Sequence, residues 1–167
     1  MKLLLFACII ICPFFSCSSQ NFLYLSKQID KKCRLKPNPK VLNFHDLRKM
    51  LYKDRKLDLF DKGSDTLYIL ESHSAQDGIY RSKIWNHNGN IEFVYSKSGF
   101  RFDEQQIFTD YTIRLIQAWD TSTIRKEEKL YSNFIPVRFI WGIRVIRGKK
   151  NIIECITFKE FFNPKDI

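Results

Sequence analysis

The C-terminal third of the chain alternates in character residue by residue, and this pattern constrains the fold more than any other feature of the sequence. Over residues 137–146, one set of alternate positions is wholly apolar, while the other set carries Arg138 and Arg144. A period of two is typical of a strand whose sheet is buried on one face. A turn at 148–151 and an apolar run over 152–158 complete a predicted terminal hairpin.

Three further segments have the composition of strands. Residues 66–72, 78–86 and 91–96 are short and rich in aromatic or β-branched side chains. The dipeptide Asn88-Gly89 between the last two is a strong signal for a hairpin turn. The sequence therefore predicts an antiparallel meander in the first half of the chain.

Helical periodicity appears in three places. We expect a short helix over 43–54, a longer one over 103–120, and another that starts at the capping residues 121–123 and continues to Lys129. The apolar stripe of the long helix is Phe108, Tyr111, Leu115 and Trp119. The fold class is α+β: a mostly antiparallel sheet of about five strands, the meander plus the C-terminal hairpin, with two or three helices on one face.

The N-terminus resembles a secretory signal. Lys2 is followed by an apolar run over residues 3–15 and then by small or polar residues. A membrane-spanning helix needs about 20 apolar residues, so a permanent span is the weaker interpretation.

The segment from Phe14 to Cys17 resembles the lipobox of bacterial lipoproteins, in which a small residue precedes the cysteine that becomes the lipid-bearing N-terminus. Ser16 takes the small position and Cys17 the lipidated one. The resemblance implies a protein held on a membrane of the cell envelope by fatty acyl chains, facing the periplasm or the exterior. An uncleaved anchor and a plain secreted protein are the alternatives.

This division predicts three parts in a chain of 167 residues, which has room for one ordinary domain. Residues 1–16 form the signal peptide, 17–40 a lipidated N-terminus and basic tether, and 41–167 a single α+β domain. The composition, with 44% apolar residues, excludes a disordered chain.

Positive charge is concentrated near the proposed lipid. Residues 27–62 hold 12 basic and 5 acidic side chains. Anionic lipid or glycan is a candidate partner for such a segment, and a solvated helix face with a tether is the alternative. Nucleic acid is not expected, since an exported protein rarely meets it. The candidate basic patch consists of Lys31, Lys32, Arg34, Lys36, Arg48, Lys49, Arg55 and Lys56.

The cysteines left after removal of the signal are Cys17, Cys33 and Cys155. In an oxidising compartment Cys33 and Cys155 are candidates for a disulfide, and two unpaired thiols are the alternative.

Residues with catalytic chemistry gather in one stretch, at the end of the first predicted strand. Glu71 and His73 are two residues apart, so they share a strand face, and Ser74 follows. No recognised nucleophile motif surrounds them, and the sequence predicts no metal site and no cofactor. A polar strand end is the simpler interpretation.

The sequence thus favours a non-enzymatic, lipid-anchored module that binds an envelope protein or an acidic envelope component. A small hydrolase that uses Glu71, His73 and Ser74, and an immunity or inhibitor protein of the envelope, are the alternatives.

Overall fold

The computed structural model describes residues 17–33, 44–55, 66–73, 78–96, 98–102, 107–130, 136–148 and 150–161. The described residues form four helices and six strands. In chain order these are α1 (Cys17–Cys33), α2 (Phe44–Arg55), β1 (Thr66–His73), β2 (Tyr80–Asn86), β3 (Gly89–Ser96), β4 (Gly99–Arg101), α3 (Asp110–Ala118), α4 (Thr121–Leu130), β5 (Pro136–Ile146) and β6 (Ile152–Phe161).

The strands form one sheet in the order β4-β3-β2-β1-β5-β6, and all neighbours are antiparallel. β1 lies in the middle, where Ile69 pairs with Ile84 of β2 on one side and Ile143 of β5 on the other. The predicted α+β class, with its meander and terminal hairpin, is confirmed. The strand count is six rather than five, because the three residues of β4 are too few to give a sequence pattern.

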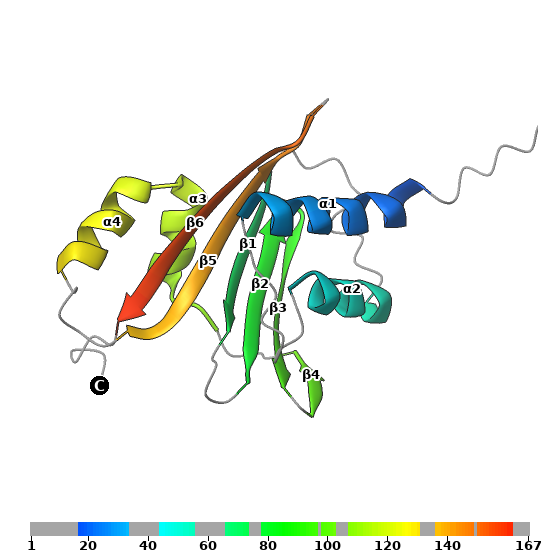
Figure 1. Cartoon of the computed structure of the whole chain (residues 1–167), viewed down its shortest axis with the longest axis horizontal. Coiled ribbons are helices and arrows are strands. Elements are labelled where there is room, and N and C mark those ends of the chain that lie inside the picture. The colour runs from blue at the N-terminus through cyan, green and yellow to red at the C-terminus, as the bar shows by residue number, and fades with distance from the viewer. Residues whose placement is uncertain are drawn as a thin grey trace, which may run out of the picture.

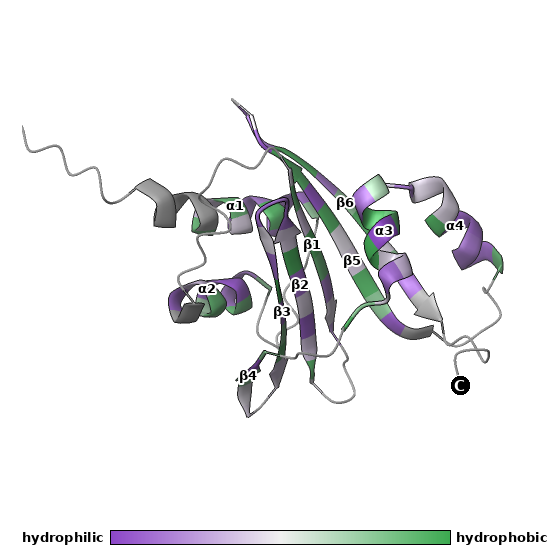
Figure 2. Ribbon diagram, turned by 180° about the vertical axis from the view of Figure 1, so that it is seen from behind, coloured by the Kyte–Doolittle hydropathy of each residue, from purple (hydrophilic) through white to green (hydrophobic). Residues whose placement is uncertain are grey.

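The helices cover both faces of the sheet, whereas the sequence suggested one face. Figure 1 shows α1 and α2 on one side and α3 and α4 on the other. Each face has its own core: Leu67 and Ile69 of β1 pack with α1 and α2, and Leu70 packs with Phe108 and Ile116 on the α3 side. Hydropathy along the strands changes from residue to residue rather than falling into one apolar block (Figure 2).

The arginines of β5 explain why one face looked solvated in the sequence. The Arg138 guanidinium lies 5.1 Å from the centre of the Phe108 ring, and that of Arg144 lies 4.7 Å from the centre of the Trp119 ring. Arginine stems and planes pack on aromatic rings while the charge keeps polar partners. A strand face that carries arginines can therefore be covered by a helix.

The segment expected to be a tether belongs, in its described part, to the folded domain. Residues 17–33 form α1, and its side chains Leu25 and Ile29 lie in the core shared with α2 and the sheet. A disulfide joins Cys33, the last residue of α1, to Cys155 of β6, with 5.5 Å between the Cα atoms. The domain boundary at 41 is therefore wrong for residues 23–33, and residues 34–40 lie outside the described ones.

The helices on the second face differ from the expected ones at their N-terminal ends. α3 starts at Asp110, after the N-cap Thr109, whose side chain accepts a hydrogen bond from the Thr112 backbone N–H. The buried residues of α3 are Thr112 and Ile116, whereas Tyr111 is exposed. The buried face of the helix therefore lies one residue further along than the predicted apolar stripe at Tyr111 and Leu115. The cap of α4 is Asp120, whose carboxylate accepts from the Thr123 backbone N–H, rather than a residue of 121–123.

Candidate functional site

A buried cluster of charged side chains lies between the α1/α2 layer and the sheet. Arg48 of α2 and Glu71 of β1 are both fully buried. Arg48 donates from Nε to Glu71 Oε1 over 2.7 Å and from Nη2 to Glu71 Oε2 over 2.6 Å. The hydroxyl of Tyr80 on β2 donates to the same Oε1. This two-bond geometry is the strongest form of arginine–carboxylate pairing.

The remaining donor of Arg48 reaches α1. Its Nη1 donates to Asp30 Oδ1 over 2.8 Å and to Ser26 Oγ over 3.0 Å. His45, also on α2, donates its backbone N–H to Asp30 Oδ2, and its Nδ1 lies 2.9 Å from Ser26 Oγ. One guanidinium therefore connects α1, α2 and β1, and Glu71 extends the connection to β2.

The charges of this cluster are compensated inside the fold. Burial opposes the charge of Arg48, but the Glu71 carboxylate and its hydrogen bonds outweigh burial and raise the pKa of Arg48. Burial, followed by the charge of Glu71, raises the pKa of the Tyr80 hydroxyl well above 10.0, so Tyr80 stays a proton donor at neutral pH. Burial lowers the pKa of His45 below 6.5, although Asp30 and Asp46 act in the opposite direction.

This arrangement positions the helices and offers a substrate nothing to bind. Arg48 and Glu71 have no exposed surface, and every oxygen of Glu71 already accepts from Arg48 or Tyr80. Breaking a buried ion pair leaves an uncompensated charge, which makes such a pair a strict specifier of geometry.

The predicted catalytic residues do not assemble into a site among the described residues. Glu71 and His73 do lie on the same strand, but Glu71 is bound to Arg48 and is inaccessible. It is therefore not placed to orient His73 as a base for a substrate. Ser74 lies outside the described residues. The described geometry gives the hydrolase alternative no support.

Sequence reasoning missed this cluster, although a signal for it exists. Ser26 stands between Leu25 and Ile29 on the buried side of α1, and Arg48 stands between Leu47 and Leu51 of α2. A polar residue inside an apolar helical stripe indicates a buried partner. The buried partner itself lies on β1 and β2, which are distant from α2 in the sequence.

The residues of the candidate basic patch do not all lie on the surface. Lys31, Lys32 and Lys49 are exposed, whereas Arg48 points into the core and does not belong to the surface. Arg34, Lys36 and Lys56, and the side chain of Arg55, lie outside the described residues.

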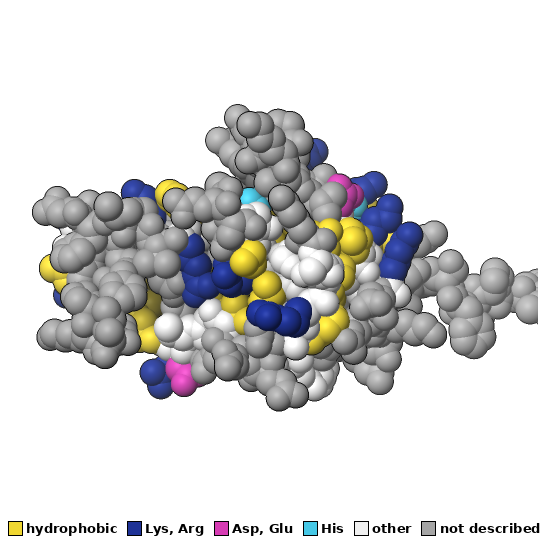
Figure 3. All heavy atoms as spheres, turned by 90° about the horizontal axis from the view of Figure 1, so that it is seen from below, with side chains coloured by type: hydrophobic (Ala, Val, Ile, Leu, Met, Phe, Trp, Pro, Cys, Tyr) yellow, Lys and Arg dark blue, Asp and Glu magenta, His cyan; other side chains and the backbone are white. Residues whose placement is uncertain are grey.

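The exposed positive charge of this layer has a regular origin. On α1, Lys27 and Lys31 each follow a buried residue, Leu25 or Ile29, by two positions, about 200° around the helix. α2 repeats the pattern, since Lys49 and Lys53 follow the buried Leu47 and Leu51. Both helices therefore turn lysines away from the sheet. Figure 3, a view from below, shows several separate groups of Lys and Arg side chains, some beside hydrophobic side chains and some beside Asp or Glu.

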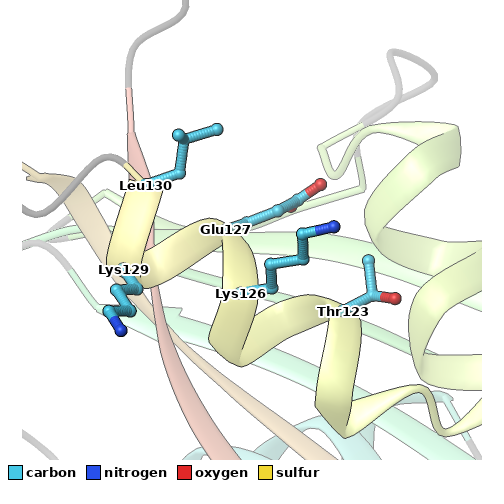
Figure 4. Close-up of a pocket in the computed structure, with 5 residues that line it drawn as sticks. All are labelled: Thr123, Lys126, Glu127, Lys129 and Leu130. Carbon is cyan, nitrogen blue, oxygen red and sulfur yellow. The ribbon is translucent and has the colours of Figure 1, made fainter.

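A shallow pocket of about 620 Å³ lies on α4, at the opposite side of the sheet. Its described lining residues, drawn in Figure 4, are Thr123, Lys126, Glu127, Lys129 and Leu130. Leu130 is 71% exposed, and Glu127 accepts a hydrogen bond from the Tyr111 hydroxyl. In Figure 4, Lys126 and Glu127 extend to the same side of α4, while Lys129 and Leu130 point to other sides of the helix.

The same helix protects the edge strand β6. Arg125 Nη1 donates to the Thr157 carbonyl over 3.1 Å, and Glu128 Oε1 accepts from the Lys159 backbone N–H over 3.1 Å. Side chains of α4 thus satisfy backbone groups that an edge strand otherwise offers to other chains.

None of the described helices combines the length and the apolar character needed to cross a membrane. In the described part of the chain, no three or more His, Cys, Asp or Glu side chains come together as metal ligands. The signal segment over 1–16 lies outside the described residues, and Cys17 is described only as the first residue of α1.

Comparison of this chain with protein-family models, with curated proteins and with solved structures found no match.

Proposed function

We propose that this chain is an exported, lipid-anchored protein of the cell envelope, and that it acts as a non-enzymatic binding or accessory module for a protein or an acidic envelope component. Cys17 carries the lipid in this proposal, and the α+β domain is held at the membrane surface through α1.

The observation that carries the proposal is the disulfide between Cys33 and Cys155. Disulfides persist in the periplasm and outside the cell and are rare in the cytosol, so the bond supports the export predicted from residues 1–16. Cys155 is exposed, which leaves the bond open to cytosolic reductants if the chain stayed inside the cell. Export and the disulfide are therefore mutually consistent.

The binding role is supported by the difference between the buried and the exposed charged side chains. The only fully buried ion pair among the described residues, Arg48–Glu71, is used to hold helices in place. The accessible features are the lysines of α1 and α2 and the α4 pocket with Lys126 and Leu130. These are recognition surfaces for acidic partners.

Intact-mass analysis of the full chain expressed in a bacterial host tests the proposal. The expected product starts at residue 17, carries fatty acyl groups, and gains two hydrogens on reduction because one disulfide opens. Replacement of Cys17 by Ala removes the acyl mass. The membrane fraction then contains no mature, acylated protein. Replacement of Cys8, the matched cysteine inside the signal segment, leaves processing unchanged.

Two results would overturn the proposal. One is a product whose Cys17 sulfur is unmodified or whose leading apolar segment is still present. The other is turnover of ester, peptide or glycoside substrates that is lost on His73→Ala, which would restore the hydrolase alternative.

A further inference from the structure

The outer face of the α1/α2 layer carries four lysines that the packing of the domain leaves exposed. They are Lys27 and Lys31 on α1 and Lys49 and Lys53 on α2. Both helices pack on the same side of the sheet, against one shared core (Figure 1). The four ammonium groups therefore belong to one surface of the molecule.

The described acidic side chains of this layer are few, and one of them, Asp30, is turned toward Arg48. Asp30 of α1 binds Arg48, and its side chain is only 18% exposed. Arg48 also forms an ion pair with Glu71 inside the core. Both Asp30 and Glu71 pair with Arg48, and the basic residues of α1 and α2 still outnumber the acidic ones by seven to three.

Apolar side chains interrupt the lysines on the same two helices. Tyr24 of α1 is 64% exposed and Met50 of α2 is 39% exposed. On α1, Tyr24 lies within about 60° of Lys27 and about 20° of Lys31 around the helix axis. Basic residues with an amphipathic aromatic side chain are the composition of surfaces that lie at the boundary of a bilayer.

We propose that the outer face of α1 and α2 lies flat on an anionic phospholipid bilayer. This inference rests on the proposed lipid attachment, because Cys17 is the first residue of α1. At 1.5 Å per residue, Lys31 is only about 21 Å along the helix from Cys17. An α1 that lies parallel to the bilayer brings both its lysines to the headgroups, and the shared core carries Lys49 and Lys53 with it.

The orientation has a consequence for recognition. Helices α3 and α4 cover the opposite face of the sheet, so they point away from the bilayer (Figure 1). The α4 pocket then faces the compartment rather than the lipid, which places Lys126 and Leu130 where a soluble partner can reach them.

Weak electrostatic contacts suffice for this orientation. A lipid anchor turns docking into an intramolecular event with a high effective concentration, and each lysine near an anionic surface adds a further attraction. Loss of two lysines is expected to weaken docking about thirtyfold, on the basis of their usual contribution at such a surface.

The test is acetylation of lysines on the acylated full chain in nanodiscs, read by peptide mass spectrometry. Discs of phosphatidylcholine alone are compared with discs that also contain phosphatidylglycerol. We expect the four lysines of α1 and α2 to be modified several-fold more slowly in the anionic discs, and Lys126 and Lys129 of α4 to react equally in both. High salt should remove the protection, because it screens exposed charges.

Charge reversal separates docking from other causes of protection. The double variant K27E/K31E should restore fast modification of Lys49 and Lys53 in anionic discs, while the matched double variant K126E/K129E on α4 should leave their protection intact. Equal modification of both faces in anionic discs, or protection confined to α4, would overturn the inference.

The two proposals fail in different ways. A chain that carries no acyl group at Cys17 does not enter the discs, and this contradicts the proposed function. The same acetylation assay with phosphatidylglycerol vesicles then still decides whether α1 and α2 dock. A chain that is acylated and inserted but leaves its lysines reactive contradicts only the docking surface.

Discussion

The ion pair between Arg48 and Glu71 is predicted to dominate the stability of the α1/α2 side of the molecule. Replacement of Glu71 by Gln keeps the shape of the side chain and an acceptor for Tyr80, but it removes the charge that compensates Arg48. The guanidinium then lies at zero exposure with Asp30 as its remaining described carboxylate.

The expected cost follows from this burial. Removal of one partner of a buried ion pair destabilises a protein by about 3 to 5 kcal/mol when the other charge is left without compensation. Asp30 still pairs with Arg48 in E71Q, so we expect a cost near the lower end of this range. Replacement of both partners, as in R48M/E71Q, removes both charges and should cost less than E71Q alone. The coupling free energy between the two positions is expected to be about 2 to 3 kcal/mol.

Urea unfolding at neutral pH with the disulfide intact, followed by circular dichroism, measures these free energies. The control is Glu128→Gln on α4, the same chemical change in a pair whose arginine, Arg125, has a side chain that is 58% exposed. It should cost less than about 1 kcal/mol. The reasoning is refuted if E71Q costs no more than E128Q, or if the effects of R48M and E71Q simply add.

Three further predictions concern other contacts. Cys33→Ser, which opens a bridge between residues 122 apart, should lower the free energy of unfolding by about 4 to 5 kcal/mol in the loop-entropy account, and reductant should then have no additional effect in a melting experiment. The pKa of His45 is lowered below 6.5 in the fold, so the unfolded chain binds more protons than the folded one below that pH. The His45 contribution to stability should therefore be complete above pH 6.5 and be lost as the pH falls below it. Denaturant titrations at several pH values should show a smaller pH dependence for His45→Gln. Gly142→Ala should cost about 1 to 2 kcal/mol by thermal unfolding, since a Cβ at this position would lie 2.6 Å from Ile116 Cδ1, and the further change Ile116→Val should recover part of the loss.

Much of the sheet could be predicted because its signals are local. The alternation in β5 and the aromatic and β-branched runs of β1, β2 and β3 place these strands to within a few residues. The hairpin turn between β2 and β3 comprises residues 87 and 88, since Asn86 pairs with Gly89. The alternation along a strand shows which side chains share a face of the sheet, but it does not show which elements cover that face. The helices α3 and α4 were therefore expected, but their place on the opposite face from α2 was not.

The buried cluster was out of reach for a related reason. The sequence suggested Glu71 as a candidate catalytic residue and Arg48 as part of a surface patch, since each was judged from its own neighbours in the sequence. The pair forms because the tertiary fold brings Arg48 of α2 to Glu71 of β1, 23 positions away in the sequence. Charge on a helix is normally solvated, and only the tertiary fold makes this guanidinium a core residue.

The same cluster explains why α1 needs more than hydrophobic packing. Its described side chains in the core are Leu25 and Ile29, and their burial contributes about 1.5 to 3 kcal/mol each. Ordering a helix of this length costs more than that in chain entropy. The hydrogen bonds of Ser26 and Asp30 to Arg48, together with the disulfide at Cys33, add the directional contacts that fix α1 on the sheet. The helix that starts at the candidate lipid site is thus joined to the domain at its middle and at its C-terminal end.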